Sequence, residues 1–284
     1  VVNATQAYEG REFLASNDER FRPVNLLTGP DGALYVVDFY RGVVQHRIYM
    51  TTWLRKQIDD RGLDRPVGLG RIWRVIPESR PTPPLPDISR LDAFALVDLI
   101  AESGNGTVRD NAQRLLVERR SIRAVSPLQS IIVNSNYEPF RRIQALWTLE
   151  GIGELDSSIV RVAMRDPEPE VREHAARVAE QLALPDAQAV LAELARDPDP
   201  RVRTQATLSI GSLPDAEAMV MLESILAAGS EGEMVRQAAY AGLANREVEF
   251  LRSRADPQEN GWMASNGAGQ RTVVRELAAA VLKR

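Results

Sequence analysis

The sequence predicts a mainly α-helical protein, an α-solenoid in which helix pairs stack into a right-handed superhelix, with a small β-rich segment at its N-terminus. Three observations lead to this fold class. A Val-Arg-x-x-Ala pattern recurs over the later part of the chain, a proline-rich stretch precedes it, and the first residues carry β-type patterns punctuated by glycine.

The recurring pattern predicts an array of helical repeats. It begins at Val108, Val171, Val202, Val235 and Val274, and a variant with arginine in the first position begins at Arg141. Successive starts are 30 to 39 residues apart, a period typical of units built from two helices. Because each unit can bury its apolar face only against its neighbours, the units are expected to stack into one continuous core.

Two Asp-Pro turns mark where helices begin. Asp199 is expected to cap a helix N-terminus, and Pro200 suits the first helical position, where its missing N–H costs nothing. Glu168 and Pro169 repeat this arrangement one unit earlier. Apolar residues at helical spacing follow each turn: Val171, Ala175, Val178, Ala179 and Leu182 in the first case, and Val202, Ala206, Ile210 and Leu213 in the second.

The repeated arginines could form an anion-binding row, or they could organise the turns. Arg172 and Arg203 each follow an Asp-Pro turn in the same unit, so we expect them to pair with Asp166 and Asp197. This interpretation gives the arginines a structural role.

The Asp-Pro-x-Pro-x-Val-Arg turns resemble the HEAT repeat family, specifically its short bacterial form. The resemblance covers about residues 90–250, and a degenerate last unit is expected at 271–284. Residues 255–270 break the period and are expected to form a loop. HEAT arrays mostly serve as scaffolds, so the resemblance implies an extended surface for a protein partner or another domain of the same chain.

The N-terminal segment contains strand signals. Gly29-Pro-Asp-Gly32 is a turn by residue chemistry, and the run 33–37 that follows it is suited to a strand. Residues 70–76 form a second candidate strand, and the interval 43–61 includes a stretch that suits a helix. A sheet of so few strands cannot bury both of its faces. We therefore expect additional sheet, beyond these strands, to cover the two faces. The stretch 77–86, with five prolines, is expected to be an extended linker.

The order Arg20-Phe-Arg22, then Gly29-Pro-Asp-Gly-x-Leu-Tyr-Val, then Gly70-Arg-Ile-x-Arg resembles the last blade of the six-bladed β-propeller of quinoprotein, PQQ-dependent glucose/sorbosone dehydrogenase-like proteins. The closer likeness is to planctomycete-type multidomain membrane-bound dehydrogenase-like or haem-binding proteins. In these a propeller of this kind is followed by HEAT repeats and often by a cytochrome c module. The resemblance covers roughly residues 9–77 and implies three segments: a terminal propeller blade at 1–77, a Pro-rich linker at 78–89 and the HEAT array at 90–284.

This second resemblance implies a cofactor contact. In the sugar dehydrogenases an Arg-x-Arg pair on this blade contacts the carboxylates of pyrroloquinoline quinone (PQQ), and the matching positions are Arg20 and Arg22. Guanidinium groups suit carboxylates. The family pattern continues with Asp where this chain has Pro23, and the alternative is that both arginines are strand-edge charges or propeller ion pairs. The family's Ca²⁺ ligands and histidine base lie upstream, so no residue of this chain matches them.

The function implied for the parent protein is a periplasmic or envelope-associated PQQ-dependent sugar or alcohol dehydrogenase, which removes a hydride from a C–OH group and passes electrons to a cytochrome c. This chain would be the C-terminal part of that protein and inactive alone, and neither PQQ nor Ca²⁺ is expected to bind it tightly. The alternative is a purely non-catalytic HEAT-repeat scaffold that binds proteins. A third interpretation, a HEAT-like enzyme of the phycobilin-lyase type, has no supporting motif beyond the repeats.

Several other polar residues are expected to have structural roles. His46 and His174 are assigned to the surface and to a helix face rather than to catalysis. Asp38, Tyr40 and Arg41 follow a strand directly, and packing and turn hydrogen bonds are favoured over a place on a propeller's central face. No residue is assigned as catalytic or as a metal ligand.

Composition narrows the function further. The chain has 284 residues, of which 44% are hydrophobic and 26% charged, so it can bury a sizeable core. Its formal net charge of −4 argues against nucleic acid as the main partner. It has no cysteine and two histidines, which disfavours a transition-metal site. There is no apolar run of about 18 residues to span a membrane. Since the chain begins at Val1 rather than Met, we expect a fragment whose targeting signal is not visible.

Overall fold

The structure is a computed structural model, and it describes residues 5–79, 87–213, 216–227, 231–255 and 267–282. The chain divides into two compact units. The first comprises residues 1–87 together with 104–108, and the second comprises 88–103 and 109–284. The predicted linker at 78–89 falls largely on residues outside the described ranges, and the three predicted segment boundaries stay a prediction.

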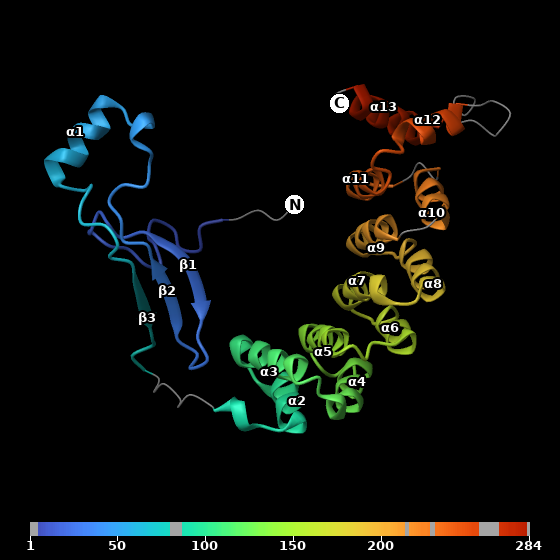
Figure 1. Cartoon of the computed structure of the whole chain (residues 1–284), viewed down its shortest axis with the longest axis horizontal. Helices are drawn as coiled ribbons and strands as arrows, with labels where there is room; N and C mark the ends of the chain where they lie inside the picture. Colours follow the sequence, from blue (N-terminus) through green and yellow to red (C-terminus); the bar gives the residue numbers. More distant parts are fainter. Residues whose placement is uncertain (1–4, 80–86, 214–215, 228–230, 256–266, 283–284) are drawn as a thin grey trace. The chain divides into compact units, whose positions relative to one another are not determined.

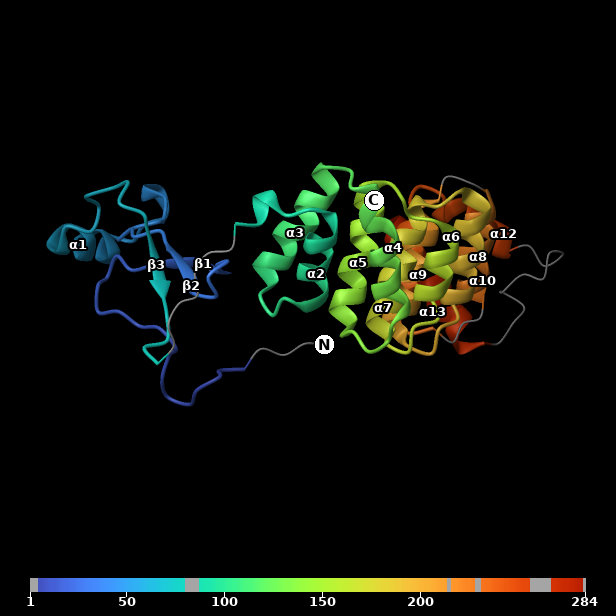
Figure 2. The same ribbon diagram turned by 90° about the horizontal axis from the view of Figure 1, so that it is seen from below.

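The N-terminal unit contains a three-stranded antiparallel sheet in the order β1-β2-β3 (Figures 1 and 2). The strands are β1 (Pro23–Thr28), β2 (Leu34–Asp38) and β3 (Arg71–Val75), and helix α1 (Thr52–Arg61) lies between β2 and β3 in the chain. The two predicted strands and the predicted helix are confirmed. Strand β1 has no counterpart in the sequence prediction. The predicted turn joins β1 to β2, where Gly32 adopts a φ of 77° and the Gly29 N–H donates to Ala33 O at 2.8 Å.

Both faces of this sheet carry exposed apolar side chains. Leu26 and Trp73 flank Val36 on one face, and their exposed fractions are 61% and 42%. Ile72 stands on the other face and is 68% exposed, next to Val37 at 36%. A sheet that is apolar on both faces is suited to the interior of a larger β structure rather than to its surface.

The second unit is a stack of helices in two rows. Figure 1 shows α3, α5, α7, α9 and α11 along one side of the stack and α2, α4, α6, α8 and α10 along the other. The helices are α2 (Ala93–Glu102), α3 (Gly106–Glu118), α4 (Val125–Val133), α5 (Pro139–Ile152), α6 (Ser157–Ala163), α7 (Pro169–Val178), α8 (Leu184–Leu194), α9 (Pro200–Ser212), α10 (Ala216–Ala227), α11 (Glu233–Gly242), α12 (Glu247–Ala255) and α13 (Ala268–Leu282). We call the row of α3, α5, α7, α9 and α11 the pattern row, because it contains five of the six Val-Arg-x-x-Ala patterns. The sixth pattern lies in α13.

The predicted core positions are confirmed with one difference. Of the nine apolar residues that follow the two Asp-Pro turns, all are buried except Leu182, which is partly buried. The loop predicted at 255–270 falls mainly on residues that the structure does not describe, and α13 already begins at Ala268. The last unit therefore starts three residues earlier than predicted.

Glycines let the pattern row pack closely at one crossing. A Cβ atom built on Gly211 of α9 would lie 2.7 Å from the Cα of Gly242 in α11, and one built on Gly242 would lie 2.9 Å from the Cα of Gly211. Any larger residue would push the two helix backbones apart. Among the described residues, no helix is both long and apolar enough to cross a bilayer.

Candidate functional site

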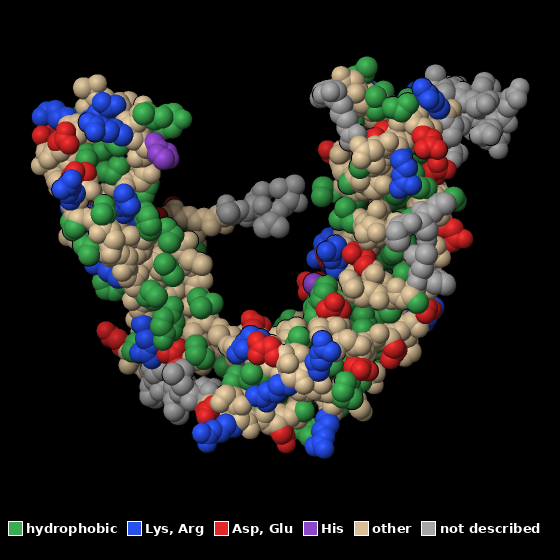
Figure 3. All heavy atoms as spheres, viewed as in Figure 1, with side chains coloured by type: hydrophobic (Ala, Val, Ile, Leu, Met, Phe, Trp, Pro, Cys, Tyr) green, Lys and Arg blue, Asp and Glu red, His purple; other side chains and the backbone are tan. Residues whose placement is uncertain are grey.

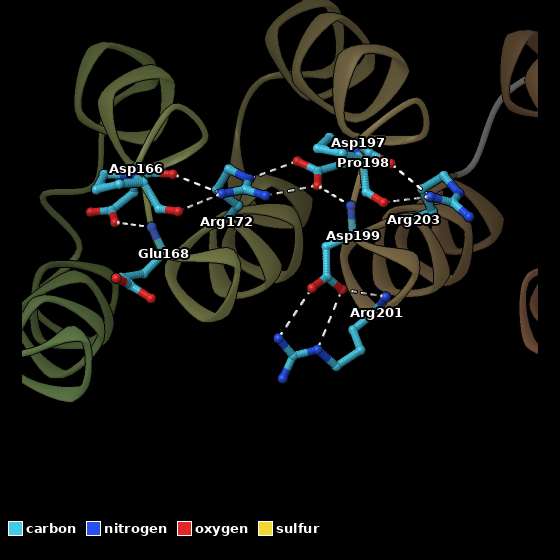
Figure 4. A network of polar contacts seen from close by, with 9 residues as sticks. Asp166, Glu168, Arg172, Asp197, Pro198, Asp199, Arg201 and Arg203 are labelled. Atoms are coloured by element: carbon cyan, nitrogen blue, oxygen red, sulfur yellow. Dashed lines mark hydrogen bonds and ion pairs between the residues drawn. The ribbon is translucent and has the colours of Figure 1, made fainter. Parts of the chain in front are cut away.

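A row of ion pairs joins successive repeats from α5 onward. Arg172 of α7 donates from Nε and Nη2 to the carboxylate of Asp197, at 2.7 and 2.9 Å, and Asp197 lies in the turn before α9 (Figure 4). The Nη1 atom of Arg172 donates to the carbonyl oxygens of Asp166 and Pro167 in its own turn, at 2.9 and 3.1 Å. One guanidinium therefore holds two consecutive turns together.

The same arrangement recurs at three further positions. Arg142 binds Asp166, Arg203 binds Glu231 and Arg236 binds Glu276, at Nε–O distances of 2.8, 3.2 and 3.0 Å. In each case another guanidinium nitrogen binds a carbonyl oxygen of the preceding turn. We call the four pairs the ladder.

The ladder confirms a structural role for the arginines but corrects their predicted partners. We expected Arg172 to pair with the Asp166 carboxylate and Arg203 with the Asp197 carboxylate, each in its own unit. Both arginines instead bind the acid of the following unit, and they reach their own turn only through backbone oxygens. The sequence pattern shows an acid about six residues before each arginine, but the carboxylate is already occupied within its turn. Asp197, for example, accepts the Asp199 N–H at 2.8 Å, so its remaining lone pairs face the preceding repeat.

The first position of the row lacks an acid. Arg109 of α3 donates from Nη1 to Ser103 O at 2.9 Å, six residues earlier, as Arg172 does to Asp166 O. Its Nε, however, donates to the amide oxygen of Gln144 at 3.2 Å. No carboxylate lies within ion-pairing distance of Arg109 in the described part of the chain. Burial, together with repulsion from Arg141, lowers the pKa of Arg109, whereas Arg172 and Arg236 have raised pKa values because of their acids.

Aromatic and polar side chains surround Arg109 on the pattern row. The guanidinium carbon of Arg109 lies 4.6 Å from the ring centroid of Phe140, and Phe140 is 43% exposed. A pocket of about 400 Å³ lies across α3, α5 and α7 at this point. Asp110 and Gln113 line one part of this pocket, and we call its other lining residues the aromatic patch: Arg109, Phe140, Ile143, Gln144, Trp147 and His174.

A hydrogen bond between two helices fixes one side of the patch. Trp147 Nε1 of α5 donates to His174 Nδ1 of α7 at 3.0 Å, with the two rings perpendicular. This bond requires an unprotonated Nδ1, and burial lowers the pKa of His174 although Glu173 and Glu170 oppose the shift. The assignment of His174 to a helix face is confirmed, but the residue also orders the patch. The signal that sequence reasoning missed is the spacing of Phe140 and Trp147, two turns apart on one helix face.

The structure gives Arg20 and Arg22 separate contacts within the N-terminal unit. Arg20 Nη2 donates to the carbonyl oxygens of Gly62 and Arg65 at 2.7 and 2.9 Å. Arg22 donates from Nε to Arg41 O at 2.8 Å and from Nη2 to Gly42 O at 3.0 Å. The two guanidinium groups thus tie two different loop segments to the residues just before β1. Nothing in the structure tests a contact with a cofactor, so their cofactor role stays a prediction.

Asp38 is the centre of the N-terminal unit's polar contacts. Its fully buried carboxylate accepts the backbone N–H groups of Arg22 and Tyr40, at 2.8 and 2.9 Å, and the side-chain N–H groups of Arg71 and Trp73, at 2.8 and 3.1 Å. Burial alone would raise the pKa of Asp38, but these four donors lower it to about 2. The preference for turn hydrogen bonds and packing at Asp38 is confirmed.

The side chains of two further candidates in this unit, Arg41 and His46, make local contacts. Arg41 Nε donates to Val43 O at 3.0 Å. His46 is exposed, with its ring against Tyr49 at a centroid distance of 6.4 Å. In the described ranges, no three His, Cys, Asp or Glu side chains are grouped closely enough to hold a metal ion.

Comparison with known proteins identifies two segments. Residues 157–244 match the family of HEAT repeats, and residues 2–79 match a domain of unknown function, DUF7133. No curated protein matches the chain. Two crystal structures of engineered proteins resemble it at 17% and 16% sequence identity, covering 67% and 68% of this chain and 96% and 100% of theirs, with TM-scores of 0.37 and 0.38. Residues 157–244 of the helical unit therefore contain HEAT repeats, and the N-terminal sheet lies within the segment that matches DUF7133.

Proposed function

We propose that the HEAT array binds a protein partner, or another domain of its own protein, through the aromatic patch. The observation that carries this proposal is an exposed phenylalanine beside a half-buried tryptophan, an arginine and a histidine at one pocket of the pattern row. Tryptophan and arginine are among the residues that contribute most to binding energy at protein interfaces.

The ladder supports this function because it makes the surface rigid. Binding costs less free energy when the contacting side chains are already ordered. Arg142, whose side chain is 1% exposed, joins α5 to the turn before α7, and the Trp147–His174 bond joins the same two helices a second time. The patch is therefore held across a repeat boundary by two independent contacts.

The charge distribution favours a protein over a nucleic acid. On the face drawn in Figure 3, basic and acidic side chains are interspersed over the array rather than separated into fields of one sign. A phosphate backbone requires a continuous basic surface.

The test is selection of ligands from a displayed library of random 12-residue peptides on the immobilised full chain. We expect selected peptides to lose binding at least about ten-fold on Phe140→Ala, which removes an exposed anchor of the patch. Phe94→Ala is the matched control, since Phe94 is 52% exposed on α2 in the other row. Peptides that bind both variants equally, or no selected peptides at all, would refute a role for the patch. Circular dichroism melting of both variants checks that the fold is retained.

We also propose, from the resemblance of residues 9–77, that the N-terminal unit is one blade of a larger β-propeller. The whole protein would then be a PQQ-dependent dehydrogenase-like protein of the periplasm or cell envelope, with a cytochrome c as electron acceptor. Exposed apolar residues on both faces of the sheet support a larger β structure, since a blade is covered by a neighbour on each side. PQQ would supply the hydride acceptor in such a protein.

A thermal-shift measurement tests the cofactor contact on this chain. We expect PQQ with Ca²⁺ to leave the melting temperature unchanged, because Arg20 and Arg22 are engaged with backbone oxygens and a ligand stabilises only a state that it binds. A saturable rise that Arg20→Ala abolishes would overturn this expectation and would show that this chain binds the cofactor through Arg20.

A further inference from the structure

We infer that the aromatic patch recognises an acidic peptide segment, in which a carboxylate binds Arg109 and a neighbouring apolar side chain packs on Phe140 and Trp147. This inference rests on the proposed function and names the chemistry of the partner. It depends on the difference between Arg109 and the four arginines of the ladder.

The ladder shows what this position ordinarily binds. At Arg142, Arg172, Arg203 and Arg236 the guanidinium joins a backbone oxygen of one turn to a carboxylate of the next unit. Arg109 keeps the first contact, to Ser103 O, but meets the neutral amide of Gln144 in place of the acid. Arg109 is thus a partly buried cation, and the equivalent arginine in each of the four ladder pairs binds a carboxylate.

The carboxylates of Asp110 and Glu138 attract Arg109, but they do not outweigh its burial and the repulsion from Arg141, and each is bound by another side chain. Asp110 accepts the Gln144 amide N–H at 3.0 Å, and Glu138 accepts Arg141 Nε at 2.6 Å. Arg141 adds a second positive charge to this end of α5 and also lies over Phe140, at 5.0 Å from the ring centroid. The Nη2 atom of Arg109 makes no hydrogen bond to any described residue. An incoming carboxylate would therefore meet an available donor.

Apolar surface lies directly beside this cation. The ring of Phe140 lies against the Arg109 guanidinium, and Ile143 and Trp147 line the same pocket. A free carboxylate ion would leave this surface exposed to water, whereas a peptide can place an apolar side chain on it. The pocket therefore favours an acidic residue next to an apolar one over an isolated anion.

His174 contributes a second donor. Because its Nδ1 accepts the Trp147 N–H, the neutral imidazole carries its proton on Nε2. His174 lines the same pocket as Arg109, so a bound peptide can meet two donors of different charge. The carboxylate is assigned to Arg109 because only that donor carries a full charge.

The experiment uses the full chain labelled with 5-fluorotryptophan, in which Trp147 is assigned by Trp147→Phe and followed by fluorine NMR. Two synthetic peptides are titrated, acetyl-Leu-Glu-Phe-amide and its neutral counterpart acetyl-Leu-Gln-Phe-amide. We expect the Glu peptide to shift the Trp147 resonance saturably, with an affinity about five- to ten-fold higher than that of the Gln peptide. The difference should shrink in 0.5 M NaCl because exposed charges are screened.

Two variants locate the preference. Arg109→Gln should bring the Glu peptide to the affinity of the Gln peptide, and Arg114→Gln should preserve the difference, since Arg114 is an exposed α3 arginine paired with Glu118. Equal binding of both peptides to the unmodified chain, or a preference that persists in Arg109→Gln, overturns the inference while the proposed patch still stands. If neither peptide shifts the Trp147 resonance, and the selected peptides bind Phe140→Ala as tightly as the unmodified chain, both the inference and the proposed function fail.

Discussion

The guanidinium of Arg172 and the carboxylate of Asp197 join two successive repeats through hydrogen bonds of 2.7 and 2.9 Å. Their side chains are 13% and 6% exposed, so neither charge is well hydrated. Burial alone would raise the pKa of Asp197, but the bonds from Arg172 and the Asp199 N–H outweigh it and lower the pKa. The carboxylate of Asp197 thus depends on Arg172 to remain charged although it is buried.

Arg172→Met should destabilise the array by about 3 kcal/mol, because it leaves the Asp197 carboxylate buried without its cation. Urea unfolding followed by circular dichroism measures the change in the free energy of unfolding. Arg177→Met is the control: its pair with Glu180 has an arginine side chain that is 55% exposed, and the expected cost is below about 1 kcal/mol. Equal losses in the two variants would contradict the role given to the ladder.

Gly211→Ala should destabilise the crossing of α9 and α11. The added methyl group would lie 2.7 Å from the Cα of Gly242, so the helices must separate, at an expected cost of about 2 kcal/mol. Thermal unfolding of the variant measures this effect. Gly104→Ala provides the comparison, because a Cβ there meets no atom within 4 Å, and its melting temperature should match that of the unmodified chain.

The array should lose stability as the pH falls from 7.5 to 5.5. The pKa of His174 is lowered in the folded state, so the unfolded chain binds more protons once the pH drops below about 6.5. Protonation also removes the acceptor for the Trp147 N–H. Melting temperatures at the two pH values measure the effect, which His174→Asn should reduce. His46→Asn should leave it intact because His46 is exposed; the reverse result would place the titration in the N-terminal unit.

In the folded N-terminal unit the carboxylate of Asp38 should stay charged until the pH approaches 2. Because the folded pKa of Asp38 is about 2, the charged carboxylate stabilises the unit by about 2 kcal/mol at pH values above 4, and this contribution is lost as the pH falls through the folded pKa. Trp73 donates to Asp38, so its 5-fluorotryptophan resonance reports the titration. A Trp73 resonance that already titrates near pH 4 would contradict the lowered pKa. In Asp38→Asn the titration should be absent.

The chain should self-associate through its exposed sheet, and Leu26→Lys with Ile72→Lys should suppress this association. Each substitution places a charge on one apolar face of the sheet, at positions that are 61% and 68% exposed. Sedimentation velocity at several protein concentrations measures the change. Val220→Lys on α10 is the control, since Val220 is 64% exposed in the array and should leave association unchanged. If the unmodified chain is monomeric at all concentrations, the exposed apolar faces of the sheet do not drive association.

The sequence alone determined the repeat array and most of its core. A period near 30 residues, Asp-Pro turns and apolar residues at helical spacing are local signals, because capping, proline geometry and helix periodicity act within a few residues. They placed Asp199 as a cap whose side chain accepts the Arg201 N–H, and they placed Val171, Ala175 and Ala206 in the core.

Only the tertiary structure decided which charges meet and where a surface is left for a partner. Arg172 lies six residues after Asp166 in the chain but binds the carboxylate of Asp197, because stacking brings the next turn within reach while the Asp166 carboxylate is held by Arg142. The aromatic patch likewise combines residues from α3, α5 and α7, whose contact depends on how consecutive units pack. Such pairings are set by the rotation between repeats, which no single stretch of sequence specifies.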